Sequence, residues 1–443
     1  MFSFPPGHNN ACPPRFGRLL ACLSLSALVA CGGSSDAGGS GTAEEEVQWA
    51  INYLKSDYLW TDQLPDSIDP AAYTSGETVL EGLRVSQDRY SSITTTEAFD
   101  SFFIAGQITG FGFNFRYEND NIRIYGVQPN APAAAAGLLR GDLITAINDK
   151  PTAQWISEGA IDEALGPSEP GIERSFSITR GPTQSGQPTE ISLSITKATY
   201  SVSYVPASGL FELGSRKVGY LNFYSFADPG VVPWRTALDD LLARGAQDLI
   251  VDLRFNGGGL ISTAAQIGSA LGTQSLAGQP MTYLTYNSQR SGSNNAFRFS
   301  EDARAGRFAN LVWLTSESTC SASEALILGI DPYRQATRIG APTCGKPVGF
   351  TPQRFNGKVF SIVTFRLENP LGVSDYFDGL TPDCLVNDSG LGVLGQADEP
   401  LTAAALQFLQ SGSCPPTSAD STTVKSTRPT PAAYGFESLT NLR

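Results

Sequence analysis

Histidine is nearly absent from this chain of 443 residues, which has a single one, His8. His8 lies in a segment that we expect to be removed, so a serine triad built on histidine is excluded. The form of acyl-transfer chemistry that needs no histidine uses a hydroxyl nucleophile with a lysine base. Ser321 and Lys346, 25 residues apart in "STCSASEAL" and "GAPTCGKPV", are the candidates for these two roles. The sequence therefore favours a hydrolase.

The N-terminus lacks an apolar run long enough to span a bilayer. Two arginines precede the apolar run 19–30, which has the length and flanks of a secretory signal. The run ends in Leu-Val-Ala-Cys, which resembles the bacterial lipobox. Residues 1–30 are therefore predicted to be a lipoprotein signal peptide, with Cys31 lipidated and inserted in a membrane. An ordinary signal peptide with an incidental cysteine is the alternative.

The residue after Cys31 bears on the destination of the lipoprotein. Gly32 stands where an inner-membrane retention signal would place aspartate. The lipobox resemblance thus implies a lipid-anchored protein of the bacterial cell envelope, in the outer membrane and facing the periplasm or the outside.

Basic residues are outnumbered by acidic ones. Removal of residues 1–30 leaves 28 basic and 43 acidic residues, a net charge of −15. An acidic surface argues against nucleic acid as a partner.

Cysteine is sparse, and its number is informative. Four cysteines follow Cys31, an even number for an oxidising compartment, which predicts two disulfides rather than four buried free thiols. Three connectivities are possible. We prefer the pairs nearest in sequence, Cys320 with Cys344 and Cys384 with Cys414.

About 400 mature residues predict two or three domains. Residues 31–43 are mostly Gly, Ser, Ala and Thr, as in a flexible tether, and residues 415–443 read as a disordered tail. Residues 44–103 have apolar positions at helical spacing and form a predicted helical region. Its apolar face is expected to contain Val47, Ile51, Leu54, Tyr58 and Leu59.

Residues 104–206 form a β-rich unit that resembles a PDZ domain. The resemblance rests on "ITGFGFNF" and on "NAPAAAAGLLRGDLITAIND". It implies a peptide-binding loop at Gly110, Phe111, Gly112 and Phe113. Glycines there let backbone N–H groups converge on a terminal carboxylate, while the sheet edge accepts an extended peptide. Alone, the two glycines would also suit a bulge or a tight turn.

From residue 207 to 414, strand and helix patterns alternate, which predicts a largely parallel sheet covered by helices. "DLIVDLRFNGGGL" places Gly257, Gly258 and Gly259 at a strand-to-helix turn. Ser321 is expected to open a later helix, where Ser-Ala-Ser-Glu also satisfies a capping box, so Ser321 could be a helix cap only.

Lys346 ends a G-x-x-x-x-G-K motif that begins at Gly340. This is the start of a phosphate-binding loop, but position 347 is proline where that loop needs serine or threonine. A nucleotide partner is rejected on this ground, and no cofactor or metal is expected.

Together these segments resemble the C-terminal processing peptidases, tail-specific serine proteases of the S41 type. "LIVDLRFNGGGL", "SASEAL", the step from Ser321 to Lys346 and "DGLTPDCLV" carry the resemblance. It implies an α/β fold with a crotonase-like ββα protease core, an inserted PDZ domain and an N-terminal helical region. It also implies Ser321 as nucleophile, Lys346 as general base, and an oxyanion hole from the N–H of Ala322 and of Gly257 or Gly258.

To act as a general base near neutral pH, Lys346 needs a pKa roughly 3 units below the usual lysine value of about 10.4. Apolar neighbours of Lys346 suit the burial that this requires. Glu324 matches the family's glutamate and either orients Lys346 or stabilises the helix start, whereas Asp331 stands one residue short of an acidic position often seen.

Two functions follow from the sequence. The first is an envelope endopeptidase that binds free protein C-termini through the PDZ-like groove and cleaves by a Ser-Lys dyad through an acyl-enzyme. The second is a membrane-tethered, non-catalytic peptide-binding adaptor that retains the protease fold.

Overall fold

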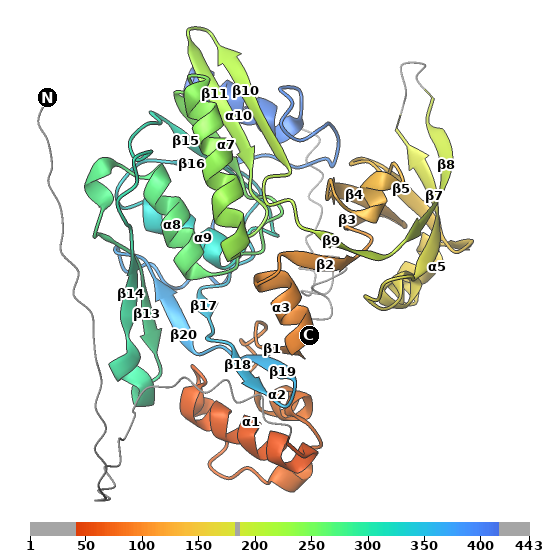
Figure 1. Ribbon diagram of the computed structural model, residues 1–443, viewed down its shortest axis with the longest axis vertical. Coiled ribbons are helices and arrows are strands. Elements are labelled where there is room, and N and C mark those ends of the chain that lie inside the picture. The colour runs from red at the N-terminus through yellow and green to blue at the C-terminus, as the bar shows by residue number, and fades with distance from the viewer. Residues whose placement is uncertain (1–40, 182–186, 416–443) are drawn as a thin grey trace, which may run out of the picture. The chain divides into compact units, whose positions relative to one another are not determined.

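The structure, a computed structural model, describes residues 41–181 and 187–415 (Figure 1). The predicted signal peptide, Cys31, most of the predicted tether and the predicted tail beyond residue 415 lie outside the described residues. Within the described ranges, no helix has the length and apolar character needed to cross a membrane.

The predicted helical region begins with α1 (Ala43–Asp57). Thr42 caps this helix: its hydroxyl accepts the N–H of Glu45, and the Glu45 carboxylate accepts the N–H of Thr42. Of the predicted apolar face, these residues are buried: Val47, Ile51, Leu54 and Tyr58. The other elements of the region are η1 (Thr61–Gln63), η2 (Pro70–Ala72), α2 (Gly76–Leu83), β1 (Ser92–Thr95) and α3 (Thr96–Phe103).

This N-terminal region does not have a core of its own. β1 pairs antiparallel with β19 (Lys358–Ser361), which also pairs with β18 (Gln353–Phe355). Its apolar side chains pack with Val348, Phe360 and Val363, which come from the far end of the chain. The shared core holds the turn that precedes β1 against the loop that precedes residue 348.

The PDZ-like unit has an antiparallel sheet in the order β3–β4–β5–β7–β8, and its buried residues form a separate core. β3 lies at one edge of this sheet, and β2 pairs with β9 where the chain enters and leaves the unit. Its elements are β2 (Gln107–Gly110), β3 (Phe113–Glu118), β4 (Asn121–Val127), α4 (Pro132–Ala135), β5 (Leu143–Ile147), β6 (Lys150–Pro151), α5 (Thr152–Ser157), α6 (Ile161–Leu165), β7 (Glu173–Arg180), β8 (Thr189–Thr196) and β9 (Ala198–Ser201).

The remaining part is built on a six-stranded sheet in the order β10–β11–β12–β15–β16–β21. All neighbours in it are parallel except β10 and β11, as the alternating strands and helices predict. The elements of this part up to β15 are β10 (Ala207–Leu213), β11 (Arg216–Asn222), η3 (Asp228–Gly230), α7 (Val231–Ala243), β12 (Asp248–Asp252), α8 (Ile261–Leu271), η4 (Gln274–Leu276), β13 (Pro280–Tyr286), η5 (Ser288–Ser293), β14 (Asn295–Arg298) and β15 (Leu311–Thr315). The later ones are α9 (Ala322–Ile330), β16 (Thr337–Gly340), β17 (Val348–Gly349), β20 (Phe365–Glu368), β21 (Cys384–Leu385) and α10 (Pro400–Ser411).

Strand alternation assigns the helices to the two faces of this sheet. Leu249 and Val251 of β12 belong to the same core as residues of α7, α8 and α9, whereas Ile250 between them packs with α10. A second, antiparallel sheet in the order β14–β13–β20–β17 contacts α9. The predicted α/β fold with an inserted β-rich unit and an N-terminal helical region is confirmed (Figure 1).

Candidate active site

The carboxyl ends of three neighbouring parallel strands bring the predicted site residues together. β12 leads into the glycine turn 257–259, β15 leads to Ser321, and β16 leads to Lys346. Because β15 pairs with both β12 and β16, the three loops leave the same edge of the sheet. This edge is where open parallel sheets bind ligands.

Ser321 precedes α9, as predicted, but it is not an ordinary helix cap. Its backbone has φ +56° and ψ −112°, whereas a cap residue normally has extended backbone. A non-glycine residue in such a conformation costs about 1–3 kcal/mol and persists where the surroundings impose it. The side chain is half-buried. The strained backbone at this position argues against a purely capping role.

The glycine turn lies directly against Ser321. A Cβ atom on Gly258 would come 2.8 Å from Ser321 Cβ and 3.0 Å from the backbone nitrogen of Ala322, so a side chain cannot fit. The N–H of Gly258 is donated to Asn256 Oδ1 at 2.9 Å. Gly257 is exposed, and among the described residues none accepts its N–H. Of the two glycines, Gly257 therefore has the N–H that is open to a ligand.

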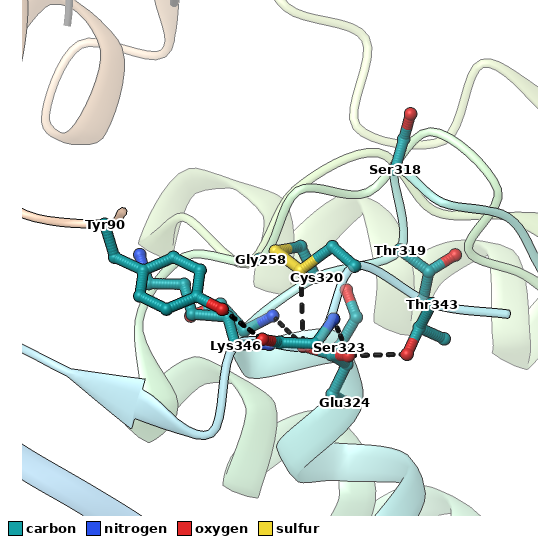
Figure 2. The surroundings of a disulfide bond; sticks show 12 residues. Tyr90, Gly258, Ser318, Thr319, Cys320, Ser323, Glu324, Thr343 and Lys346 are labelled. Carbon is teal, nitrogen blue, oxygen red and sulfur yellow. Dashed lines mark hydrogen bonds between the residues drawn. A yellow bond between two sulfur atoms is a disulfide. The ribbon is translucent and has the colours of Figure 1, made fainter. Parts of the chain in front are cut away.

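Glu324 is the centre of the site. Its fully buried carboxylate accepts the N–H of Ser321 at 2.8 Å, of Gly345 at 2.8 Å and of Lys346 at 2.9 Å. The hydroxyl of Thr343 donates to the same carboxylate, and Figure 2 shows these bonds meeting at Glu324. Burial raises the pKa of Glu324 above its usual range, although these hydrogen bonds oppose the shift. The two roles weighed from the sequence therefore coexist, because one carboxylate holds both the helix start and the lysine segment.

Lys346 lies in a desolvated environment. Its Nζ is 4.8 Å from the centre of the Phe350 ring and 5.6 Å from that of Tyr90. Burial lowers the pKa of Lys346 to about 8, although Asp88 and Glu324 oppose the shift. The direction is the one that a general base requires, and it has the predicted cause.

Within the described residues, no hydrogen bond joins the side chains of Ser321 and Lys346. The bonds that Ser321 and Lys346 make to Glu324 come from their backbone N–H groups. Bonds between catalytic side chains often become short only when substrate binds.

Both predicted disulfides are present, Cys320–Cys344 and Cys384–Cys414, with Cα–Cα distances of 5.2 and 5.3 Å. The first bridges the residue before Ser321 and the second residue before Lys346. Cys344 Sγ lies 3.5 Å from the Glu324 carboxylate, and because it has no hydrogen this is a contact and not a hydrogen bond. Two sulfurs bonded to each other are also not thiolate ligands for a metal.

Asp331 lies at the other end of α9 from Ser321. It is paired with Arg338 at 4.0 Å, and burial raises the pKa of Asp331 to about 6 despite that partner. Among the described residues, Asp331 is thus not a group that contacts Ser321 or Lys346, whereas Glu324 bonds to the backbone of both.

The predicted peptide-binding loop lies between β2 and β3. Gly112 has φ +88°, and a Cβ atom there would come 2.0 Å from Ala131 Cβ, so the turn requires glycine. The rings of Phe111 and Phe113 are buried in the core of the PDZ-like unit. These two residues therefore offer only backbone groups to a peptide, at the start of the edge strand β3.

A buried ion cluster joins the PDZ-like unit to the turn after β12. The guanidinium of Arg254 pairs with Asp252 at 2.7 Å, Glu399 at 2.6 Å and Asp388 at 3.2 Å. Arg140 of the PDZ-like unit contacts both Asp388 and Glu399. Despite burial, the two guanidinium groups hold the pKa of Asp388 below its usual range.

Sequence reasoning did not find this cluster, nor Asn256, nor the turn from Asp88 to Ser91 beside Lys346. The charged residues of the cluster lie far apart in the sequence, between Arg140 and Glu399, and their spacing follows no recognisable motif. Asp-Arg-Tyr-Ser at residues 88–91 is a short polar run that resembles many surface turns.

Three models of protein families match the chain. They are peptidase family S41 over residues 217–386, the peptidase S41 N-terminal domain over 45–92, and the PDZ domain over 123–166. The last two correspond to the N-terminal region and to the PDZ-like unit described above.

Two of the curated relatives are named as proteases that process carboxyl termini. A carboxy-terminal-processing protease of Bartonella bacilliformis is 26% identical over 321 residues, which cover 70% of this chain and 69% of the relative. A carboxyl-terminal-processing protease of Synechocystis is 26% identical over 352 residues, 78% of this chain and 76% of the relative.

Two solved structures have the same fold. A protein described as an S41 protease from Bacteroides fragilis has a TM-score of 0.68 at 22% identity, covering 82% of this chain and 97% of that one. The photosystem II D1 C-terminal processing protease has a TM-score of 0.52 at 17% identity, covering 83% and 98%. The chain is therefore a peptidase that contains a peptidase domain of the S41 type, with a PDZ domain ahead of it.

Proposed function

We propose that this peptidase is a serine endopeptidase in which Ser321 is the nucleophile and Lys346 the general base. One observation carries the proposal: a strained serine and a desolvated lysine are held by the same buried carboxylate, Glu324. A structural cap would need neither the backbone strain nor a desolvated lysine nearby.

The chemistry follows from the state of the lysine. With a pKa of about 8, roughly a tenth of the Lys346 side chains are neutral at pH 7. The neutral amine takes the proton of Ser321 Oγ as this oxygen attacks the scissile carbonyl carbon. The resulting ammonium returns the proton to the departing amine when the peptide C–N bond breaks, which leaves an acyl-enzyme. Water, deprotonated by the same amine, then hydrolyses the ester.

The oxyanion of each tetrahedral intermediate is assigned to the N–H groups of Ala322 and Gly257. Gly257 is chosen over Gly258 because the N–H of Gly258 is already bonded to Asn256. Each such donor typically contributes about 3 kcal/mol to the transition state.

Substrates are proposed to be proteins with free C-termini. β3 is an edge strand, so an extended peptide can add to the sheet there, and the turn at Gly112 directs backbone groups to its end. Arg116 on β3 also pairs with Glu317, four residues before Ser321. A bound peptide would thus lie beside the catalytic loop.

The proposed location is the bacterial cell envelope, with a lipid anchor on Cys31 in the outer membrane. The lipobox-like sequence supports this, and the two disulfides suit an oxidising compartment.

One experiment tests mechanism and location together. Fractionated cells are treated with a fluorophosphonate probe, which reacts with activated serines. We expect a labelled band in the membrane fraction for the wild type, no band for Ser321→Ala, and a band in the soluble fraction for Cys31→Ser. Equal labelling of wild type and Ser321→Ala would reject the nucleophile. If the wild-type protein is present in the membrane fraction but is not labelled, the non-catalytic peptide-binding adaptor is favoured instead.

The role of the PDZ-like loop can be tested with peptide ends. Amidation of the C-terminus of a test peptide is expected to weaken its binding to Ser321→Ala protein about tenfold or more, because the N–H donors lose a charged acceptor. Titration calorimetry with free-acid and amidated peptides measures this. Equal affinities would exclude carboxylate recognition.

A further inference from the structure

The turn 88–91 of the N-terminal region forms one wall of the Lys346 environment. The hydroxyl of Tyr90 donates to the carbonyl oxygen of Gly345 and accepts from Nε of Arg89 at 2.9 Å. The guanidinium of Arg89 in turn donates to the carbonyl oxygen of Phe377 at 2.6 Å. Figure 2 shows Tyr90 beside Lys346, on the side away from Thr343. The turn is thus bonded to the backbone that carries the proposed base.

These bonds act on one peptide group. The carbonyl of Gly345 and the N–H of Lys346 belong to the same planar unit. Tyr90 binds its oxygen, and Glu324 binds its nitrogen at 2.9 Å. Because the two groups point in opposite directions, the unit is fixed from two sides. Glu324 comes from the helix that follows the nucleophile, whereas Tyr90 comes from a different region of the chain.

The ring of Tyr90 has a second contact with the base. Lys346 Nζ lies 5.6 Å from its centre and 4.8 Å from the centre of the Phe350 ring. The two rings thus form part of the surroundings that desolvate the amine. The stem of Lys346 is therefore held at its start by hydrogen bonds and at its end by ring contacts.

The side chain of Asp88 stabilises the turn 88–91 by hydrogen bonds. Its buried carboxylate accepts the hydroxyl of Tyr58 at 2.8 Å and the N–H groups of Tyr90 at 3.1 Å and Ser91 at 2.9 Å. The negative charge of Asp88 also favours the ammonium form of Lys346. The ionisable groups of the elements packed here include Tyr58, Asp88, Arg89, Tyr90, Glu324 and Tyr376.

We propose that Tyr90 is a positioning residue for Lys346, held in place by Asp88, so that the N-terminal region completes the catalytic site. The inference rests on the proposed role of Lys346 as general base. It assigns a task in catalysis to a region that otherwise reads as a helical extension of the fold.

The test compares two tyrosine-to-phenylalanine variants. Tyr90→Phe removes the bond to the Gly345 carbonyl. Tyr53→Phe is the matched control, because the Tyr53 hydroxyl donates to the carbonyl of Thr351 at 3.2 Å in the same region without touching Lys346. We expect kcat for peptide hydrolysis to fall about tenfold in Tyr90→Phe, with KM nearly unchanged. A tenfold fall corresponds to the free energy that one hydrogen bond typically contributes. Tyr53→Phe is expected to retain the wild-type kcat.

Asp88→Asn gives an independent readout if Tyr90→Phe is poorly folded. Loss of the negative charge destabilises the ammonium, so the pH midpoint of kcat should move to lower pH than in the wild type. Wild-type kcat in Tyr90→Phe together with an unchanged midpoint in Asp88→Asn would overturn the proposal. Activity retained in Lys346→Ala would instead reject the lysine mechanism itself, so the two failures are distinguishable.

Discussion

Replacement of Ser321 or Lys346 by alanine is expected to lower kcat for peptide hydrolysis by about four orders of magnitude or more. In the proposed mechanism, Ser321→Ala removes the nucleophile and Lys346→Ala removes the group that takes its proton. Two residues that act as one unit have non-additive effects, so the double variant should be no worse than either single one. Steady-state kinetics with a fluorogenic peptide measures all three.

A neighbouring serine provides the control for this comparison. Ser318 lies in the same loop, and Figure 2 shows its side chain directed away from Glu324. Ser318→Ala should keep the wild-type kcat. The wild-type rate should also rise with pH through about 8, because only the neutral amine of Lys346 accepts the proton. A pH-independent rate between 6 and 9, or substantial activity in Lys346→Ala, would contradict the assignment.

Removal of the Cys320–Cys344 disulfide is expected to lower both stability and activity. The bond spans 24 residues, and loss of such a crosslink corresponds to about 3 kcal/mol of unfolding free energy in the chain-entropy model. Because the two cysteines flank the nucleophile and the base, the double variant Cys320→Ala with Cys344→Ala should also lower kcat. Chemical unfolding and kinetics on the same preparation measure the two effects.

The other disulfide is a matched control. Cys384–Cys414 spans 30 residues, so the chain-entropy model gives nearly the same stabilisation. It joins β21 to the segment after α10, and neither sulfur contacts the site. Its removal should therefore lower stability to a similar extent and leave kcat unchanged. An equal loss of kcat in both double variants would show that the first disulfide has no specific effect on the dyad.

Periodicity predicted the parts of this fold that depend on local sequence. The alternating strands and helices after residue 207 gave the parallel sheet, and a parallel sheet brings the loops after β12, β15 and β16 to one edge. The positions of Ser321 and Lys346 followed from that order and from their motifs. The cysteine pairs nearest in sequence were also the pairs that form.

The remaining features depend on contacts between distant segments. Tyr90 meets Gly345 across 255 positions, and nothing near Tyr90 in the sequence indicates this partner. The N-terminal region shares its core with residues 348–363, a packing that apolar periodicity cannot assign to one partner. The side chain of Asn256 accepts the N–H of Gly258, and the glycine-rich sequence alone does not indicate this bond. In each case the feature arises from a tertiary contact, and the sequence of neither segment alone predicts that contact.

At the proposed envelope location, the Cys320–Cys344 disulfide beside the proposed dyad would also set the moment at which the enzyme can act. Bacterial cytoplasm keeps thiols reduced, so a newly made chain would hold Cys320 and Cys344 as separate thiols until export. The segment carrying Lys346 would then lack its covalent tether to the nucleophile. Oxidation in the envelope would complete the site only after the chain has left the compartment that made it. Such a chain would reach its destination as a latent precursor, and cytoplasmic proteins would be spared without a pro-peptide or an inhibitor.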